Sequence, residues 1–202
     1  MNGSIDSPAD IEINEGFQKV IESLKGLHNV LLTGKAGTGK STLLNLLIQN
    51  EIVQAVAVVA PTGVAAINVG GMTVHRFFSF PGNVTVEMVS SKDYFPGKYI
   101  KEIRNLKTLI IDEISMLRAD LLDCIEVSLR RFGPKTNQPF GGVQMVFVGD
   151  LLQLPPLPKE RRRCFCDTVM EHPTFFQAMP SIRFGLNCTN LLRSTDRRIK
   201  NS

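Results

Sequence analysis

The stretch that most constrains the fold of this chain is a glycine-rich loop, Gly34-Lys35-Ala36-Gly37-Thr38-Gly39-Lys40-Ser41. It directly follows a short apolar run, residues 28–32, and it precedes a leucine-rich segment with helical spacing, residues 40–49. The loop satisfies the pattern G-x-x-x-x-G-K-[ST], which binds phosphate when a strand precedes it and a helix follows it. A glycine-rich turn can match this pattern by chance, but the predicted strand and helix favour a nucleotide phosphate site.

The residue types in the loop suit a polyphosphate. Glycines let backbone N–H groups turn inward around phosphate oxygens, and the N-terminus of the following helix adds the positive end of its dipole. Lys40 is predicted to reach the β- and γ-phosphates, and the Ser41 hydroxyl is predicted to bind Mg²⁺. The loop therefore predicts a site for a nucleotide and a magnesium ion.

Four apolar runs are predicted strands: residues 28–32, 53–60, 106–111 and 143–148. Helical spacing marks the segments around them, at residues 14–25, 40–49, 62–69, 73–78 and 115–131. Because no hairpin signal joins the runs, the pattern favours an α/β fold, with a parallel sheet and helices on both faces. Such sheets bind ligands at the carboxyl ends of their strands. Residues 81–97, rich in turn-forming types, are expected to form a surface insertion.

Acidic and amide side chains follow two of the predicted strands. Asp112 and Glu113 come directly after the third apolar run. In a phosphate-loop site Asp112 would hold Mg²⁺ through its water shell, and Glu113 would orient and deprotonate the attacking water. Two adjacent carboxylates can also be a solvated strand end. After the fourth run, Gln153 is a candidate contact for the γ-phosphate, with Asp150 bracing the loop, although this stretch alone is only a Pro-terminated turn.

Composition excludes several protein classes. With 202 residues, 43% hydrophobic and 21% charged, the chain suits one folded domain. No apolar run approaches the roughly 18 residues of a membrane span, so a transmembrane protein is excluded and no membrane partner is expected. Four cysteines are too few and too unevenly placed for a disulfide scaffold. We expect an intracellular protein, in the cytoplasm or nucleoid of a bacterium or in the nucleus or mitochondrion of a eukaryote.

Four stretches together resemble the Pif-one/RecD-like superfamily 1B DNA helicases, and more specifically the first RecA-like domain (1A) of the bacterial Pif-one-type members. They are GKAGTGKST (34–42), APTGVAAINVGGMTVHRFF (60–78), LIIDEISMLRADLL (109–122) and PFGGVQMVFVGDLLQLPP (139–156). The resemblance implies a RecA-like P-loop NTPase fold. It also implies ATP hydrolysis coupled to 5′-to-3′ translocation on single-stranded DNA, in DNA repair, recombination or replication, with ATP and Mg²⁺ as cofactors.

The resemblance also assigns roles to residues. ATP would contact Gln18, which would read the adenine, and the loop residues Gly34, Ala36, Gly37, Thr38, Gly39, Lys40, Ser41 and Thr42. Magnesium would be held by Ser41 and Asp112. Single-stranded DNA would contact Pro61, Thr62, Gly63, His75, Arg76 and Phe77, because hydroxyls and backbone N–H groups suit phosphates and rings suit unstacked bases. Gln18 is alternatively an exposed helix residue, and His75 and Phe77 are alternatively packing residues of a short helix.

Arg193 is the last residue to which the resemblance assigns a role. It lies in a stretch similar to the family's motif IV, where an arginine points at the γ-phosphate and stabilises charge during phosphoryl transfer. Here Ser194 replaces the glutamine that follows this arginine in the family, so a plain surface arginine is the alternative. The predicted catalytic set is therefore Lys40, Glu113, Gln153 and Arg193.

Three segments are expected: a flexible leader (1–13), the RecA-like ATPase domain (14–157) and a basic C-terminal segment (158–202). Residues 151–202 carry nine Lys or Arg against four Asp or Glu, which suits phosphate polyanions or a solvated tail. The family's second RecA-like domain is not found in the sequence, although we expect it in the full-length protein, which is expected to be a monomer. The alternative function is a truncated nucleotide- and single-stranded-DNA-binding module without unwinding activity. A clamp-loader or AAA-type ATPase would show oligomer-forming arginines and a helical lid, and the sequence shows neither.

Overall fold

The computed structural model describes residues 15–35, 37–150 and 182–185. In these residues six strands form one sheet, and all the neighbouring strands pair in parallel. The strands are β1 (Asn29–Thr33), β2 (Val56–Ala60), β3 (Met72–Thr73), β4 (Thr108–Ile111), β5 (Gln144–Gly149) and β6 (Ile182–Gly185), in the spatial order β3-β2-β4-β5-β1-β6. The predicted α/β fold with a parallel sheet is confirmed.

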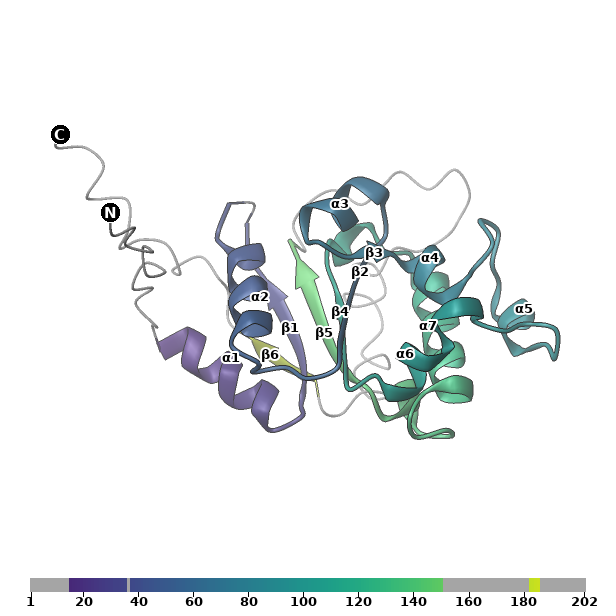
Figure 1. Cartoon of the computed structure of the whole chain (residues 1–202). Helices are drawn as coiled ribbons and strands as arrows, with labels where there is room; N and C mark the ends of the chain where they lie inside the picture. Colours follow the sequence, from purple (N-terminus) through teal and green to yellow (C-terminus); the bar gives the residue numbers. More distant parts are fainter. Residues whose placement is uncertain (1–14, 36, 151–181, 186–202) are drawn as a thin grey trace, which may run out of the picture.

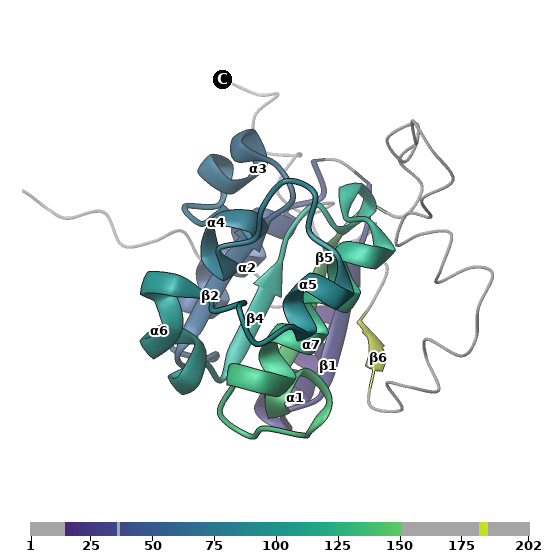
Figure 2. The ribbon, with the colours of Figure 1, turned by 90° about the vertical axis from the view of Figure 1, so that its right-hand side faces the viewer.

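Helices cover both faces of this sheet. The described helices are α1 (Glu15–Lys25), α2 (Lys40–Gln49), α3 (Gly63–Asn68), α4 (Val74–Phe78), α5 (Val86–Ser90), α6 (Ile100–Asn105) and α7 (Ala119–Phe132). Figure 1 shows α1 and α2 on one side of the sheet and α4 to α7 on the other, and Figure 2 looks onto the second side. Among the described helices none is both long enough and apolar enough to span a membrane.

The core consists of two layers, one on each face of the sheet, because successive strand residues point to opposite faces. Leu31, Ile111 and Phe147 belong to the cluster that packs against α4 to α7. Their neighbours Val30, Ile110 and Val146 belong to the cluster that packs against α1 and α2. All six side chains are buried, as expected for a parallel sheet that is covered on both faces.

Most of residues 81–97 are exposed, as expected of a surface segment, but the segment is anchored in the core. They contain α5, whose Val89 is buried in the core, and Val84, shortly before α5, is buried as well. The Tyr94 hydroxyl lies 2.8 Å from the carbonyl oxygen of Phe78, to which it donates, and 2.9 Å from the hydroxyl of Ser128 on α7. The sequence did not predict α5 or these contacts, because tertiary packing of a few apolar side chains outweighs local turn propensity.

Other elements differ from their predicted bounds. Strand β2 begins at Val56 rather than at residue 53, and α7 begins at Ala119 rather than at residue 115. A short 3-10 helix, Ile114–Met116, and an extended Leu117 come before α7, so the chain turns after β4 and does not enter the helix directly. Strand β6 pairs with β1, although the sequence placed residues 182–185 in a separate C-terminal segment.

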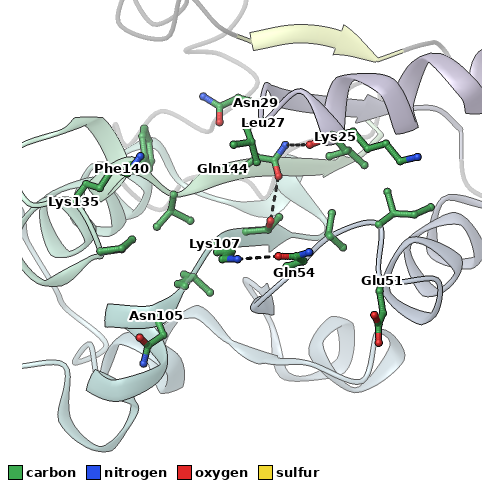
Figure 3. A pocket seen from close by; sticks show the side chains of 18 of the residues that line it. Lys25, Leu27, Asn29, Glu51, Gln54, Asn105, Lys107, Lys135, Phe140 and Gln144 are labelled. Carbon is green, nitrogen blue, oxygen red and sulfur yellow. Dashed lines mark hydrogen bonds between the residues drawn. The ribbon is translucent and has the colours of Figure 1, made fainter.

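A cavity of about 1120 Å³ opens at the N-terminal ends of the strands, at the edge of the sheet opposite the phosphate loop. Gln144 lies at its centre, and its amide nitrogen donates to the carbonyl oxygens of Leu24 and His28 at 3.0 and 2.8 Å. The Thr108 hydroxyl donates to the amide oxygen of Gln144 at 3.1 Å, and Figure 3 shows how these groups point toward one another. Because these polar groups satisfy each other, the Gln144 network joins α1, β4 and β5 rather than presenting a site.

Candidate nucleotide and DNA site

The phosphate loop connects β1 to α2 at the C-terminal edge of the sheet. The N–H of Gly34 donates to the carbonyl oxygen of Gly149 at 3.3 Å, which ties the start of the loop to the end of β5. Gly37 and Gly39 have φ angles of 77° and 83°, in the left-handed region that favours glycine. No side chain caps α2 at Gly39, which leaves the backbone N–H groups of its first turn available to a ligand. Such a helix N-terminus suits an anion.

Lys40 is the first residue of α2, and its side chain turns back over the loop. Its ammonium nitrogen donates to the carbonyl oxygens of Gly34 at 2.7 Å and Lys35 at 2.9 Å. Thr38 closes the same loop, with its hydroxyl donating to the Lys35 carbonyl oxygen at 2.8 Å. Ser41 and Thr42 are exposed on the first turn of α2. The loop therefore presents backbone N–H groups, one ammonium and two hydroxyls at one place.

The acidic pair lies beside this loop. Asp112 directly follows β4, and its N–H donates to the carbonyl oxygen of Val59 at 2.9 Å. Its side chain is 6% exposed, and burial raises the pKa of the Asp112 carboxyl, while a backbone hydrogen bond from Glu113 and the Lys40 ammonium oppose the shift. Desolvation favours the neutral form of an acid in this way. A nearby cation would therefore stabilise the ionised form of the Asp112 carboxyl.

Glu113 has an unusual backbone conformation, with φ at 52° and ψ at 47°. Few non-glycine residues adopt this left-handed region, and such positions cluster at functional sites. Burial raises the pKa of Glu113, and the negative charges of Asp112 and Asp150 add to the shift while Lys40 opposes it. The charges of Lys40, Asp112 and Asp150 therefore all act on the Glu113 carboxyl.

The donor set fits a magnesium ion. Mg²⁺ prefers hard oxygen ligands and commonly combines one or two protein groups with water and substrate phosphates. The Asp112 carboxylate and the Ser41 hydroxyl are oxygen donors of this kind. Among residues 15–35, 37–150 and 182–185 no cluster of three or more His, Cys, Asp and Glu side chains could hold a metal ion. The remaining ligands would come from water and from the nucleotide.

A close backbone contact connects β5 to the turn after β4. A Cβ atom at Gly149 would lie 2.9 Å from Cγ2 of Ile114 and 3.0 Å from its backbone nitrogen. Next to Ile114, the Ser115 hydroxyl is fully buried and has no hydrogen-bond partner among the residues that the structure describes. Sequence reasoning missed Gly149 and Ser115, although the glycine directly before Asp150 was a signal. This contact joins the strand that leads to Asp150 to the turn that carries Glu113.

The predicted DNA motifs begin with two capped helices. The Thr62 hydroxyl accepts from the N–H of Ala65 at 3.3 Å, and the Thr73 hydroxyl accepts from the N–H of Arg76 at 3.2 Å. Pro61, Thr62 and Gly63 are partly or fully exposed at the end of β2. These caps fix the positions of α3 and α4 beside the C-terminal edge of the sheet.

The three predicted DNA residues of α4 differ in exposure. Arg76 is exposed and His75 is partly buried. Burial, and then the Arg118 guanidinium, lower the pKa of His75. Phe77 is only 2% exposed, and its ring packs edge-on against Phe78 with centroids 5.0 Å apart. A ring buried in this way cannot stack on a base, so for Phe77 the packing interpretation fits the structure.

The remaining predicted residues divide into two groups. Gln18 is exposed on α1, and β1 lies between this helix and the loop in the sequence. Ala36, Gln153 and Arg193 lie outside the described residues, as do residues 1–13.

Arg118 was missed by sequence reasoning; it lies at the start of α7 and its guanidinium donates to both carboxylate oxygens of Asp120, at 2.9 and 2.5 Å.

Solved structures with this fold include Pif1 from Bacteroides. The chain matches Bacteroides sp Pif1 in complex with ADP-AlF4 with a TM-score of 0.69 and 41% identity, over 75% of this chain and 35% of that one. It matches Bacteroides Pif1 bound to single-stranded DNA with a TM-score of 0.66 and 42% identity, over 74% of this chain and 34% of that one.

Curated relatives give the same result. The ATP-dependent DNA helicase PIF1 of Saccharomyces cerevisiae (strain YJM789) is 39% identical over 153 residues, which are 72% of this chain and 18% of the relative. The human ATP-dependent DNA helicase PIF1 is 40% identical over 149 residues, 73% of this chain and 23% of the relative. The chain thus spans about a fifth of these relatives. Because residues 11–200 match the PIF1-like helicase family, the chain belongs to that family.

Proposed function

We propose that this chain is the ATP-binding RecA-like domain (1A) of an ATP-dependent 5′-to-3′ DNA helicase. The observation that carries the proposal is that the phosphate loop with Lys40 follows β1 and the pair Asp112 and Glu113 follows β4, at the same C-terminal edge of the parallel sheet. A phosphate loop beside an acidic pair is the arrangement that phosphoryl transfer needs. The family and the neighbours solved with ADP-AlF4 support it.

Hydrolysis would use these residues in a defined order. Lys40 would exchange the carbonyl oxygens of Gly34 and Lys35 for β- and γ-phosphate oxygens of ATP. Glu113 would accept a proton from water as the water oxygen bonds to the γ-phosphorus and the bond to the ADP oxygen breaks. Its raised pKa makes Glu113 a stronger base than an exposed glutamate. Magnesium held by Asp112 and Ser41 would neutralise phosphate charge.

Three further roles complete the proposed nucleotide site. Gln18 would read the adenine, Gln153 would contact the γ-phosphate, and Arg193 would stabilise charge on the transferred group. An arginine in that position contributes on the order of a thousandfold to turnover. We infer these roles from the resemblance of the surrounding motifs, and each is testable by substitution with alanine.

Single-stranded DNA would bind at the residues after β2 and on α4. Thr62, Gly63 and Arg76 are at least partly exposed there, and hydroxyl, backbone N–H and guanidinium groups suit phosphates. The Bacteroides neighbour solved with single-stranded DNA supports this assignment. Unwinding needs two domains that close and open in turn, so we expect a second RecA-like domain in the full-length protein, acting as a monomer.

The test is ATP turnover by this chain with and without single-stranded DNA, beside Lys40→Ala and Glu113→Gln. We expect turnover that DNA raises and that both substitutions abolish, while Glu113→Gln still binds nucleotide because it keeps the shape of the site. Nucleotide binding without turnover would favour the alternative, a binding module without unwinding activity. A folded chain that binds no nucleotide would contradict the proposal.

A further inference from the structure

A short turn beside α4 brings a second cation to the predicted DNA motif. The turn is the 3-10 helix Gly97–Tyr99, and the Ser79 hydroxyl at the end of α4 donates to the carbonyl oxygen of Pro96 at 3.0 Å. Gly97 has a φ of 65°, and a Cβ atom there would lie 2.7 Å from the Ser79 hydroxyl oxygen. The turn is therefore packed closely against the end of α4, and its position relative to Arg76 is defined.

Tyr99 is the centre of this contact. Its ring packs on the buried ring of Phe77, with centroids 5.7 Å apart, which fixes the direction of the phenol. The Lys98 ammonium lies 4.8 Å from the centroid of the Tyr99 ring. Hydrogen bonding from Lys98, and more weakly from Arg76, lowers the pKa of the Tyr99 phenol. The Lys98 ammonium therefore lies over the Tyr99 ring, and that ring packs on Phe77, the residue that follows Arg76 in α4.

Among the described residues, no carboxylate forms an ion pair with Arg76 or Lys98. In the described part of the chain, the side-chain ion pairs join Arg118 to Asp120 and Arg130 to Glu126. Arg76 and Lys98 are both exposed and take part in neither pair. Two cations and a hydroxyl that can donate are the groups that bind a phosphate oxyanion.

We propose that Arg76, Lys98 and Tyr99 together bind one phosphate of single-stranded DNA, so that the DNA track continues from α4 onto the turn 97–99. Lys98 and Tyr99 lie outside the motifs that predict DNA contacts. The inference rests on the proposed function, because it extends the same DNA surface by one phosphate. Arg76 supplies a planar fork, Lys98 a point charge, and the Tyr99 hydroxyl a donor between them.

The test is binding of fluorescein-labelled oligothymidine by the chain, measured by fluorescence anisotropy at several salt concentrations. Lys98→Ala should weaken binding several-fold and reduce the slope of log K against log salt by about 0.7, the value for one phosphate contact on a single strand. Lys98→Arg should keep the slope. Tyr99→Phe keeps the ring on Phe77 and should weaken binding without changing the slope, because no charge is lost.

Lys25→Ala is the matched control. It removes the same charge from the last turn of α1, at the opposite edge of the sheet, and should change neither slope nor specific affinity. If Lys98→Ala behaves like Lys25→Ala while His75→Ala and Arg76→Ala weaken binding, the inference is overturned and the proposed DNA surface stands. If none of these substitutions weakens binding, the proposed DNA surface fails as well.

Discussion

The side-chain nitrogen of Lys40 lies 2.7 Å from the carbonyl oxygen of Gly34, at the other end of the same loop. A second bond to the carbonyl oxygen of Lys35, at 2.9 Å, holds the ammonium over the loop. The same ammonium opposes the raised pKa values of Asp112 and Glu113. Lys40 thus has two roles: it braces the loop, and it compensates part of the negative charge of the acidic pair. If a phosphate binds the Lys40 ammonium, the loop loses this brace and the acidic pair loses part of the compensating positive charge.

Lys40→Ala should therefore reduce ATP turnover by about 10²- to 10³-fold, the loss expected when one donor to the developing charge is removed. Lys35→Ala is the matched control, because Lys35 contributes its carbonyl oxygen while its side chain is exposed. We expect Lys35→Ala to retain turnover within about twofold, consistent with a substitution at an exposed surface position. Turnover is measured in a coupled ATPase assay. Equal losses in both variants would show that turnover depends on the total positive charge of the loop rather than on the position of the Lys40 ammonium.

Gly149→Ala should destabilise the fold by about 1–3 kcal/mol, because the added methyl group would meet the side chain and backbone of Ile114 where the main chain cannot move away. The free energy of unfolding in urea measures this. Gly82→Ala is the control: a Cβ atom at Gly82 has nothing within 4 Å. A change within about 0.5 kcal/mol is expected there. If Gly149→Ala is as stable as Gly82→Ala, the contact between β5 and the Glu113 turn is looser than its distances indicate.

Glu113 should make the unliganded chain less stable as the pH rises. The pKa of Glu113 is raised in the folded state, so its protonated form favours folding. Its contribution to the free energy of unfolding is complete below the pKa of the unfolded state, and it is lost as the pH rises through the pKa of the folded state. We expect Glu113→Gln to flatten the fall in unfolding free energy above about pH 4.5. Glu51→Gln, at an exposed position at the opposite edge of the sheet, is the control. Identical pH profiles for the parent chain and Glu113→Gln would contradict this role.

The local parts of this molecule could be predicted from its sequence. A phosphate-loop site needs only a strand, the glycine-rich loop and a helix. These three parts are contiguous in sequence, so β1, the loop and α2 follow from the motif. Asp112 was placed beside the loop because parallel strands bring their carboxyl ends to one edge. The left-handed backbone of Glu113 could not be predicted, because nothing in a glutamate favours it; the surrounding fold imposes it.

Tertiary packing decided the features that sequence reasoning missed. Phe77 and Phe78 are adjacent aromatic residues, and helical spacing alone did not show that both point into the core. Val84, Val89 and Tyr94 lie among turn-forming residues, and their partners come from α4 and α7, which lie elsewhere in the sequence. Gln144 reaches α1 across more than a hundred positions of sequence, a contact that no local pattern contains.

The two tyrosines should titrate in separate steps. Burial raises the pKa of Tyr94 to about 12, whereas hydrogen bonding from Lys98 lowers the pKa of Tyr99. The chain contains two tyrosines and no tryptophan, so phenolate absorbance reports them directly. We expect Tyr99→Phe to remove the first step and Tyr94→Phe to remove the second. The folded state keeps Tyr94 protonated to a higher pH than the unfolded state does. The free energy of unfolding should therefore fall as the pH rises from about 10, the pKa of an exposed tyrosine, toward the pKa of Tyr94 in the folded state.

The same variants separate charge effects from packing. Tyr94→Phe leaves the Phe78 carbonyl oxygen and the Ser128 hydroxyl without their shared partner, which should cost about 1–3 kcal/mol of unfolding free energy. Tyr99→Phe should leave stability within about 0.5 kcal/mol, because its hydroxyl is at the surface. Lys98→Ala should raise the pKa of the first step toward that of a free phenol. A first step that Lys98→Ala leaves unchanged would show that the ammonium does not reach the Tyr99 hydroxyl in solution.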